Sequence, residues 1–171
     1  MDLTTLLKRP EVFREFLIDS KINCYSKLTE KNEFPDQFSS SFSCGELYPS
    51  YKLKWENLKH IVKQEVFLNR EVIWSLKLNG RIVPVIESDL QKIKHTITQA
   101  MLSQRKNIIP ARGPLIARIG DYEYSSRATE FVNEYDEIFN FNISEKLRRK
   151  SDKQIVYTAE VKGRLLLEEK A

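Results

Sequence analysis

Two stretches of this chain alternate apolar and polar residues in the same phase. They are residues 73–82, IWSLKLNGRI, and residues 156–165, VYTAEVKGRL. Side chains along a β-strand point alternately to its two faces, so each stretch predicts a strand with one apolar and one polar face. Aligning the stretches places Trp74 on Tyr157 and Gly80 on Gly163 with the same face assignment. A shift of one residue would reverse the faces, so the match predicts two similar sheet units.

Each stretch also contains a glycine that predicts a turn. Asn79-Gly80 lies between apolar segments, and Asn-Gly is a preferred pair at the centre of a type I′ hairpin turn. Lys162-Gly163 repeats this signal more weakly, because lysine seldom adopts a positive φ. We therefore expect hairpin turns at Gly80 and Gly163.

Apolar stripes at helical spacing predict two main helices, at about residues 10–20 and 89–104. Residues 34–45 are expected to form a loop. Residues 105–114 contain two prolines and a glycine, which is typical of a linker.

These elements together predict the fold class. We expect an α+β protein whose mostly antiparallel sheet consists of two related β-meanders, with the two main helices packed on it. The meanders would occupy about residues 46–87 and 115–167. The whole chain, 1–171, is expected to form a single domain.

The composition is that of an ordinary globular protein, with 41% hydrophobic and 30% charged residues and a net charge of +4. No secretory signal is visible and no apolar run could cross a membrane, so we expect a cytoplasmic location without membrane contact. In that compartment Cys24 and Cys44 should be reduced thiols. The mild, interspersed charge permits weak attraction to polyanions but does not require it.

Four short motifs suggest a relationship to known proteins: FLIDSKINCYS, WSLKLNG, RGPLIARIGDYEY and VYTAEVKG. In these motifs the chain resembles, over about residues 12–166, a bacterial domain family of unknown function often fused to Cro/C1-type helix-turn-helix regulators. It departs from that family at Lys77-Leu78-Asn79, where the family has Asn-Tyr-Tyr, and at Lys63, where the family has glycine. The resemblance implies a domain class and a regulatory or sensing context, and it implies no activity.

Motifs of common catalytic and cofactor sites are missing from the sequence. The histidines, His60 and His95, belong to no HxH, HExxH or Cys/His pattern, and neither GxGxxG nor GxxxxGK[ST] occurs. We therefore predict no metal and no cofactor, and we favour a protein that is not an enzyme.

One catalytic alternative stays open. Glu160-Val161-Lys162 places a carboxylate and an amine on one face of a strand, and Asp121 could supply a second carboxylate. Such a set is similar to the metal-dependent nucleases of restriction-endonuclease-like type, in which acidic oxygens hold Mg²⁺ and lysine positions water or phosphate.

The favoured hypothesis is a non-catalytic binding or sensing module for a small ligand, a peptide or a protein. Its site is expected in a cleft between the halves, near Trp74, Arg81, Arg112, Tyr157 and Arg164. Arg81 and Arg164 occupy equivalent positions in the two stretches and could clamp an anion from two sides.

Nucleic-acid binding without chemistry is a further alternative. It would use the basic run EKLRRKSDK, whose side chains could contact phosphates. The cations of this run are Lys146, Arg148, Arg149, Lys150 and Lys153.

Overall fold

The computed structural model describes residues 3–31, 34–41, 45–83, 87–103, 112–130 and 139–166. The helices are α1 (Leu3–Lys8), α2 (Pro10–Thr29) and α3 (Glu87–Leu102). The strands are β1 (Gln37–Ser41), β2 (Leu47–Glu56), β3 (Lys59–Leu68), β4 (Glu71–Ile82), β5 (Ile116–Ile119), β6 (Tyr122–Glu130), β7 (Phe141–Arg149) and β8 (Ile155–Leu165).

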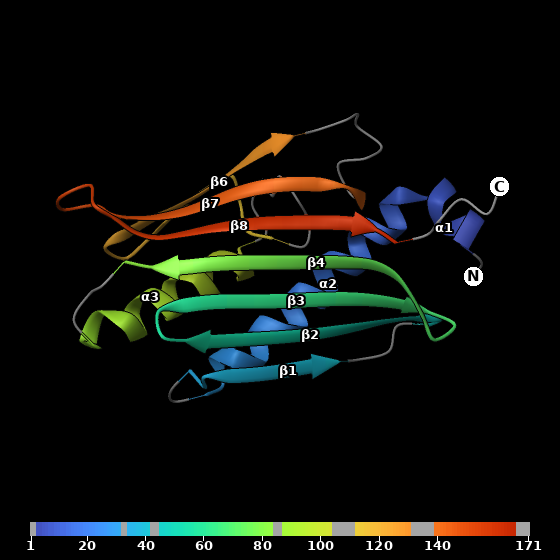
Figure 1. Ribbon diagram of the computed structural model, residues 1–171, viewed down its shortest axis with the longest axis horizontal. Helices are drawn as coiled ribbons and strands as arrows, with labels where there is room; N and C mark the ends of the chain where they lie inside the picture. The colour runs from blue at the N-terminus through green and yellow to red at the C-terminus, as the bar shows by residue number, and fades with distance from the viewer. Residues whose placement is uncertain are drawn as a thin grey trace.

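All the strands belong to one eight-stranded antiparallel sheet, with the order β1-β2-β3-β4-β8-β7-β6-β5 (Figure 1). Strands β1 to β4 are therefore neighbours in chain order, and so are β5 to β8. The two sets meet where β4 pairs with β8, so that Leu78 lies opposite Val161 and Trp74 opposite Leu165. This confirms the predicted α+β class with a mostly antiparallel sheet.

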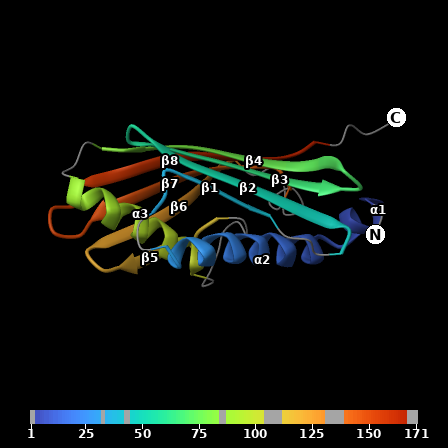
Figure 2. The same ribbon diagram turned by 90° about the horizontal axis from the view of Figure 1, so that it is seen from below.

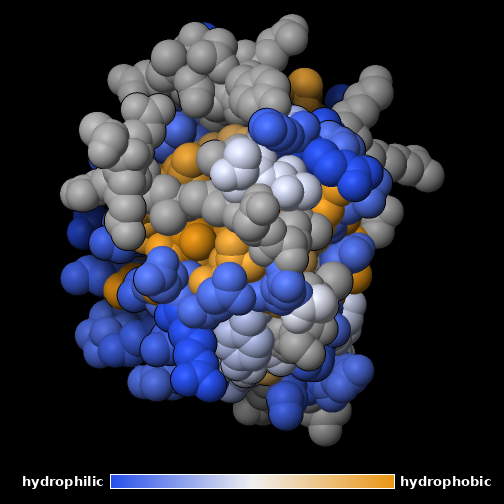
Figure 3. Space-filling model, turned by 90° about the vertical axis from the view of Figure 1, so that its right-hand side faces the viewer, coloured by the Kyte–Doolittle hydropathy of each residue, from blue (hydrophilic) through white to orange (hydrophobic). Residues whose placement is uncertain are grey.

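The helices α2 and α3 pack against the same face of the sheet and against each other (Figure 2). The hydrophobic core fills the layer between helices and sheet. Viewed from the end where α1 lies, hydrophobic side chains gather between hydrophilic margins (Figure 3). No described helix or strand covers the opposite face, which we call the open face of the sheet.

The prediction of turns at Gly80 and Gly163 is wrong, because both glycines lie inside strands. Alternation continues through Gly80: Leu78, Gly80 and Ile82 face the core while Asn79 and Arg81 face outward. In the first half the hairpin turns lie instead at Asn57-Leu58 and Asn69-Arg70, where both central residues have positive φ. Such paired positive φ angles characterise a type I′ turn, and asparagine tolerates them.

The two strand glycines instead make room for aromatic rings on the core face. A Cβ at Gly80 would lie 2.8 Å from the Tyr157 ring, and one at Gly163 would lie within van der Waals overlap of the Phe141 ring. The ring of Tyr157 can therefore lie flat against the backbone of β4 only because residue 80 has no side chain.

Other boundaries also differ from expectation. The first main helix extends to Thr29 rather than to about residue 20, and α3 ends at Leu102. Residues 37–41, expected to be loop, form the edge strand β1. Of the expected linker, 105–114, the structure describes only residues 112–114. Cys44 lies outside the described residues, whereas Cys24 is described and buried.

Because the Tyr157 ring occupies the space beside Gly80, we expect Gly80→Ala to lower the free energy of unfolding by about 1–3 kcal/mol through overpacking. Urea denaturation measures the change. Asn79→Ala is the matched control on the same strand, since its side chain is exposed, and it should stay within about 0.5 kcal/mol of wild type. Equal stability of Gly80→Ala and wild type would contradict this packing.

Candidate functional site

The five residues predicted to form a ligand site lie on opposite sides of the sheet. Trp74, Arg112 and Tyr157 are fully buried between sheet and helices. Arg81 and Arg164 are exposed and project from the open face. The structure therefore does not assemble the five around one cleft.

Arg81 and Arg164 are also far apart on the open face. Arg81 lies opposite Thr158, whereas Arg164 lies opposite Ser75, six residues further along β4. At about 3.3 Å per residue this separation is about 20 Å, which is too long for both guanidinium groups to hold one small anion. Arg164 is engaged locally, since it donates hydrogen bonds to the Phe141 carbonyl (2.9 Å) and to Asn142 Oδ1 (2.9 Å).

Asp121 of the nuclease alternative is likewise separated from Glu160 and Lys162, which are neighbours on the outward face of β8. Glu160 pairs with Ser144 of β7, whereas Tyr122, next to Asp121, pairs with Arg149 of the same strand. Five residues along β7 correspond to about 17 Å, well beyond the few ångströms over which two carboxylates share a metal ion. The described part of the chain contains no cluster of three or more His, Cys, Asp or Glu residues that could hold a metal.

The basic run of the nucleic-acid alternative begins on β7 and continues into the β7–β8 turn. Lys146 and Arg148 project from the open face. Arg149 instead forms an ion pair with Asp152 (2.8 Å), and Lys150 donates to the Gly120 carbonyl (2.6 Å). Lys153 is exposed in the turn itself, with a φ of 61°. Only the first two cations therefore belong to an extended surface.

That extended surface is strongly basic. Outward positions on the open face are occupied by many more cations than acids, and their excess is larger than the net charge of the whole chain, +4. The described cations are Lys52, Lys54, Lys59, Lys63, Lys77, Arg81, Arg118, Arg127, Lys146, Arg148, Lys162 and Arg164. The described acids are Glu56, Glu65, Glu123 and Glu160.

A row of lysines crosses the middle of the open face. Strand pairing places Lys52 opposite Lys63, Lys63 opposite Lys77, and Lys77 opposite Lys162. Neighbouring strands are about 4.8 Å apart, so the lysine row spans about 14 Å across β2, β3, β4 and β8. Lys63 has a nearby acid, Glu65, at 2.7 Å. Like charges directly opposite one another in a sheet are destabilising, so this row has an energetic cost.

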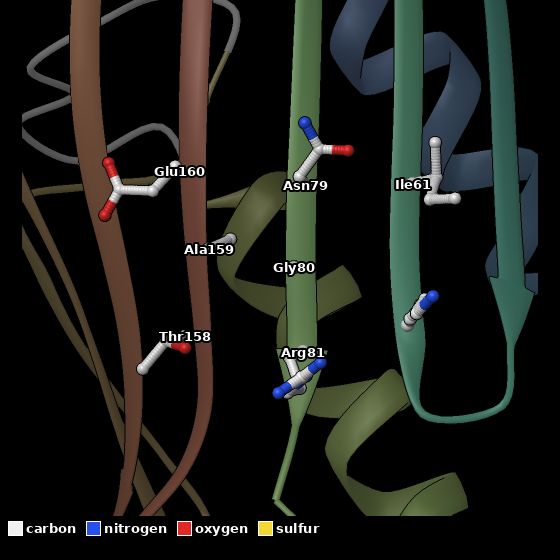
Figure 4. Close-up of a pocket in the computed structure, with 8 residues that line it drawn as sticks. Ile61, Asn79, Gly80, Arg81, Thr158, Ala159 and Glu160 are labelled. Carbon is white, nitrogen blue, oxygen red and sulfur yellow. The ribbon is translucent and has the colours of Figure 1, made fainter.

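Beside the lysine row lies a shallow hollow of about 420 Å³ above Gly80 and Ala159. Figure 4 looks onto the open face, with the helices behind the strands, and shows the side chains of Asn79, Arg81 and Glu160 standing on the viewer's side. Lys59 and Thr158 also line it. The hollow is partly open, and its lining offers charged and hydrogen-bonding groups to a ligand on the open face.

The core face of the sheet contains a buried ion pair that the sequence analysis did not predict. Arg112 Nε lies 2.6 Å from Glu145 Oε1 and Nη2 lies 2.8 Å from Oε2, and both side chains are fully buried. Arg112 also donates to the hydroxyl of Tyr25 (3.2 Å), and Lys21 Nζ donates to the Arg112 carbonyl (2.9 Å). Arg112 is therefore a structural residue that joins α2 to β7.

A second buried polar contact involves His60. Its Nδ1 shares a hydrogen bond with the Tyr157 hydroxyl at 2.8 Å, and its ring stacks on Trp55 with centroids 3.8 Å apart. Burial, assisted by the positive charges of Arg112 and Lys94, holds the pKa of His60 well below its usual value. The imidazole is thus held in its neutral form, and it packs between the Trp55 ring and the Tyr157 hydroxyl.

The sequence contained a signal for two of these buried charged residues. Glu145 occupies an inward position between Ile143 and Leu147, and a carboxylate within an apolar stripe indicates a buried partner. Lys21 occupies a similar position in the buried stripe of α2. The lysine row had no such signal, because its members come from distant segments and meet only once the strand register is known.

Comparison of the chain with models of known families, with curated proteins and with solved structures found no match. None of the described helices is both long and apolar enough to span a lipid bilayer. The geometry and charge of the described residues are therefore the basis for assigning a function.

Burial gives Lys21 a titration that stability measurements can detect. Burial, together with the positive charge of Arg112, lowers its pKa from 10.5 to about 7, against the opposing effect of Glu145. Between about pH 7 and pH 9 the unfolded chain binds a proton at this amine that the folded protein lacks, so the free energy of unfolding should rise with pH. Lys21→Met should flatten this rise, and Lys27→Met should preserve it.

Urea midpoints at pH 7, 8 and 9 provide the measurement. The range stops near pH 9 because burial raises the pKa of Cys24 from 9.0 to about 12, which lowers stability at higher pH. A rise of the same size in Lys21→Met and wild type would refute this account of Lys21.

The Arg112–Glu145 pair should behave as a unit. Removing one partner leaves an uncompensated buried charge, so Arg112→Met alone is expected to cost about 3–5 kcal/mol of the free energy of unfolding. The double variant Arg112→Met/Glu145→Leu should recover most of that loss. A double-mutant cycle by chemical denaturation measures the coupling, and additive losses would mean that the pair is not coupled.

Proposed function

We propose that the protein is a non-catalytic binding module that holds a nucleic acid strand on the open face of its sheet. The lysine row is the observation that carries this proposal. Phosphate groups are the anions that such a row suits best, because they are regularly repeated along an extended polymer and release counterions when lysine replaces them.

The cost of the lysine row supports a charged ligand. Lys77 and Lys162 are direct neighbours across the β4–β8 pairing and repel each other in the free protein. An anion lying over the row would relieve that repulsion. A neutral ligand would leave it in place, so the row favours polyanion binding over the binding of a neutral metabolite.

The shape of the surface supports an extended ligand. Cations continue beyond the lysine row to Lys146 and Arg148 on one half and Lys59 on the other. The hollow above Gly80 is shallow and lies within this basic surface. An enclosed pocket buries most of a small molecule, whereas this surface would contact a polymer along its length.

We further propose that the two halves derive from one duplicated unit of a helix followed by four strands. The sheet order supports this, since β4 and β8 lie side by side at its centre. The register also supports it: Trp74 lies opposite Leu165, and the aligned position Tyr157 lies opposite Ile82 in the same way. The resemblance to regulator-associated domains fits a binding role and stays a prediction.

Charge reversal on the open face tests the proposed function. We expect Lys77→Glu/Lys162→Glu to weaken binding of a fluorescent oligonucleotide at least tenfold and to reduce the dependence of affinity on salt. Arg14→Glu/Lys31→Glu makes the same change in net charge at exposed positions away from the sheet and should bind like wild type. Fluorescence anisotropy at several salt concentrations measures both. Equal weakening by the two double variants would mean that only net charge matters.

A further inference from the structure

One corner of the open face carries two aromatic rings, one exposed and one partly buried. Tyr48 of β2 and Phe67 of β3 lie opposite each other, and their ring centroids are 6.1 Å apart with an interplanar angle of 63°. Tyr48 is 42% exposed and Phe67 is partly buried. They lie near the β3–β4 turn, where β2 begins and β3 ends.

These rings are exceptional among the aromatic residues of the described strands that follow β1. The others face the core and are buried: Tyr51, Trp55, Trp74, Tyr122, Tyr124, Phe141 and Tyr157. The alternation of β2 and β3 therefore sends two large rings to the same side as the lysine row. The exposed part of these rings gains little from folding, so their outward position calls for another explanation.

A hollow beside the two rings offers space for a planar group of a ligand. A hollow of about 310 Å³ is lined by Tyr48 and Phe67 together with Glu46, Asn69 and Arg70. The turn residues Asn69 and Arg70 are exposed, and their positive φ angles are set by the hairpin turn. A ring placed here would find aromatic surface beside a guanidinium group and an amide.

We propose that the ligand is single-stranded nucleic acid, whose backbone crosses the lysine row while an unpaired base stacks at this aromatic corner. The inference rests on the proposed function and adds the class of nucleic acid to it. Along β2, Tyr48 lies four residues from Lys52, about 13 Å, which a strand of a few nucleotides spans. Bases inside a duplex are already stacked on each other and cannot enter the corner.

Arg70 fits the same ligand. Guanidinium groups pair with phosphate oxygens and stack on bases, so Arg70 suits either part of a nucleotide placed beside Tyr48. The acid Glu46 also lines the hollow, and its carboxylate can accept hydrogen bonds from exocyclic amino groups of bases. An anionic membrane or an acidic protein would use the cations but would offer no planar rings to the corner.

The decisive experiment compares ligands that share charge but differ in exposed bases. Fluorescence anisotropy would measure wild-type binding to single-stranded RNA and DNA of the same sequence, to the matching duplexes, to heparin and to phosphatidylserine vesicles. We expect single strands to bind at least tenfold more tightly than duplexes. The RNA and DNA arms distinguish which of the two sources supplies the ligand.

Variants at the corner separate stacking from charge. Tyr48→Ala and Phe67→Ala should each weaken single-strand binding about tenfold while leaving the salt dependence and heparin binding unchanged. Tyr48→Phe keeps the ring and should bind like wild type. Unchanged heparin binding by Tyr48→Ala would show that this variant is folded. An oligonucleotide with abasic sites should bind the wild type as weakly as the intact strand binds Tyr48→Ala.

The outcomes separate the two proposals. If duplex, heparin and single strands bind equally and Tyr48→Ala changes nothing, the single-strand inference is overturned while polyanion binding stands. If only vesicles bind, or if no polyanion binds at all, both proposals are overturned.

Discussion

The buried pair of Arg112 and Glu145 is the interaction on which the two-layer structure depends. Arg112 precedes β5, Glu145 lies in the middle of β7, and the hydroxyl that Arg112 also contacts belongs to Tyr25 of α2. The pair thus fastens the helix of the first half to the strands of the second. In an interior of low polarity both charges need each other, which makes the relative position of helix and sheet specific.

The two faces of the sheet carry side chains of different chemical character. Aromatic rings fill the core face, and Gly80 and Gly163 permit two of them to lie against the strands. Cations and short polar residues occupy the open face. Because the strand alternation assigns each residue to one face, the same strands that bury Tyr157 also present Thr158 and Glu160 outward. The packed core and the basic open face are therefore built by alternate residues of the same segments.

Local patterns predicted much of the fold. The alternation at 73–82 and 156–165 correctly indicated strands and their faces, and helical spacing located most of α3. The turns failed because Asn79-Gly80 is a strong hairpin signal locally, whereas the space required by Tyr157, a residue far along the chain, determined the role of Gly80. Asn57-Leu58 and Asn69-Arg70 were missed because they carry no glycine.

The candidate site was less predictable for a physical reason. A sequence shows that Lys52, Lys63, Lys77 and Lys162 face outward on their own strands, but their adjacency depends on the register of three strand pairings. The two similar stretches suggested instead that residues at aligned positions lie together. That reasoning grouped Arg81 with Trp74, which the sheet places on the opposite face.

The central position of β8 has a consequence for how the protein is made. Its neighbour β4 is synthesised more than seventy residues earlier. Until β8 emerges from the ribosome, β4 is paired only with β3, and the backbone amides and carbonyls on its other edge have no partner strand. Such an edge readily accepts a foreign strand. Lys77 and Arg81, repelling an identical nascent chain, would protect β4 from self-association during that interval.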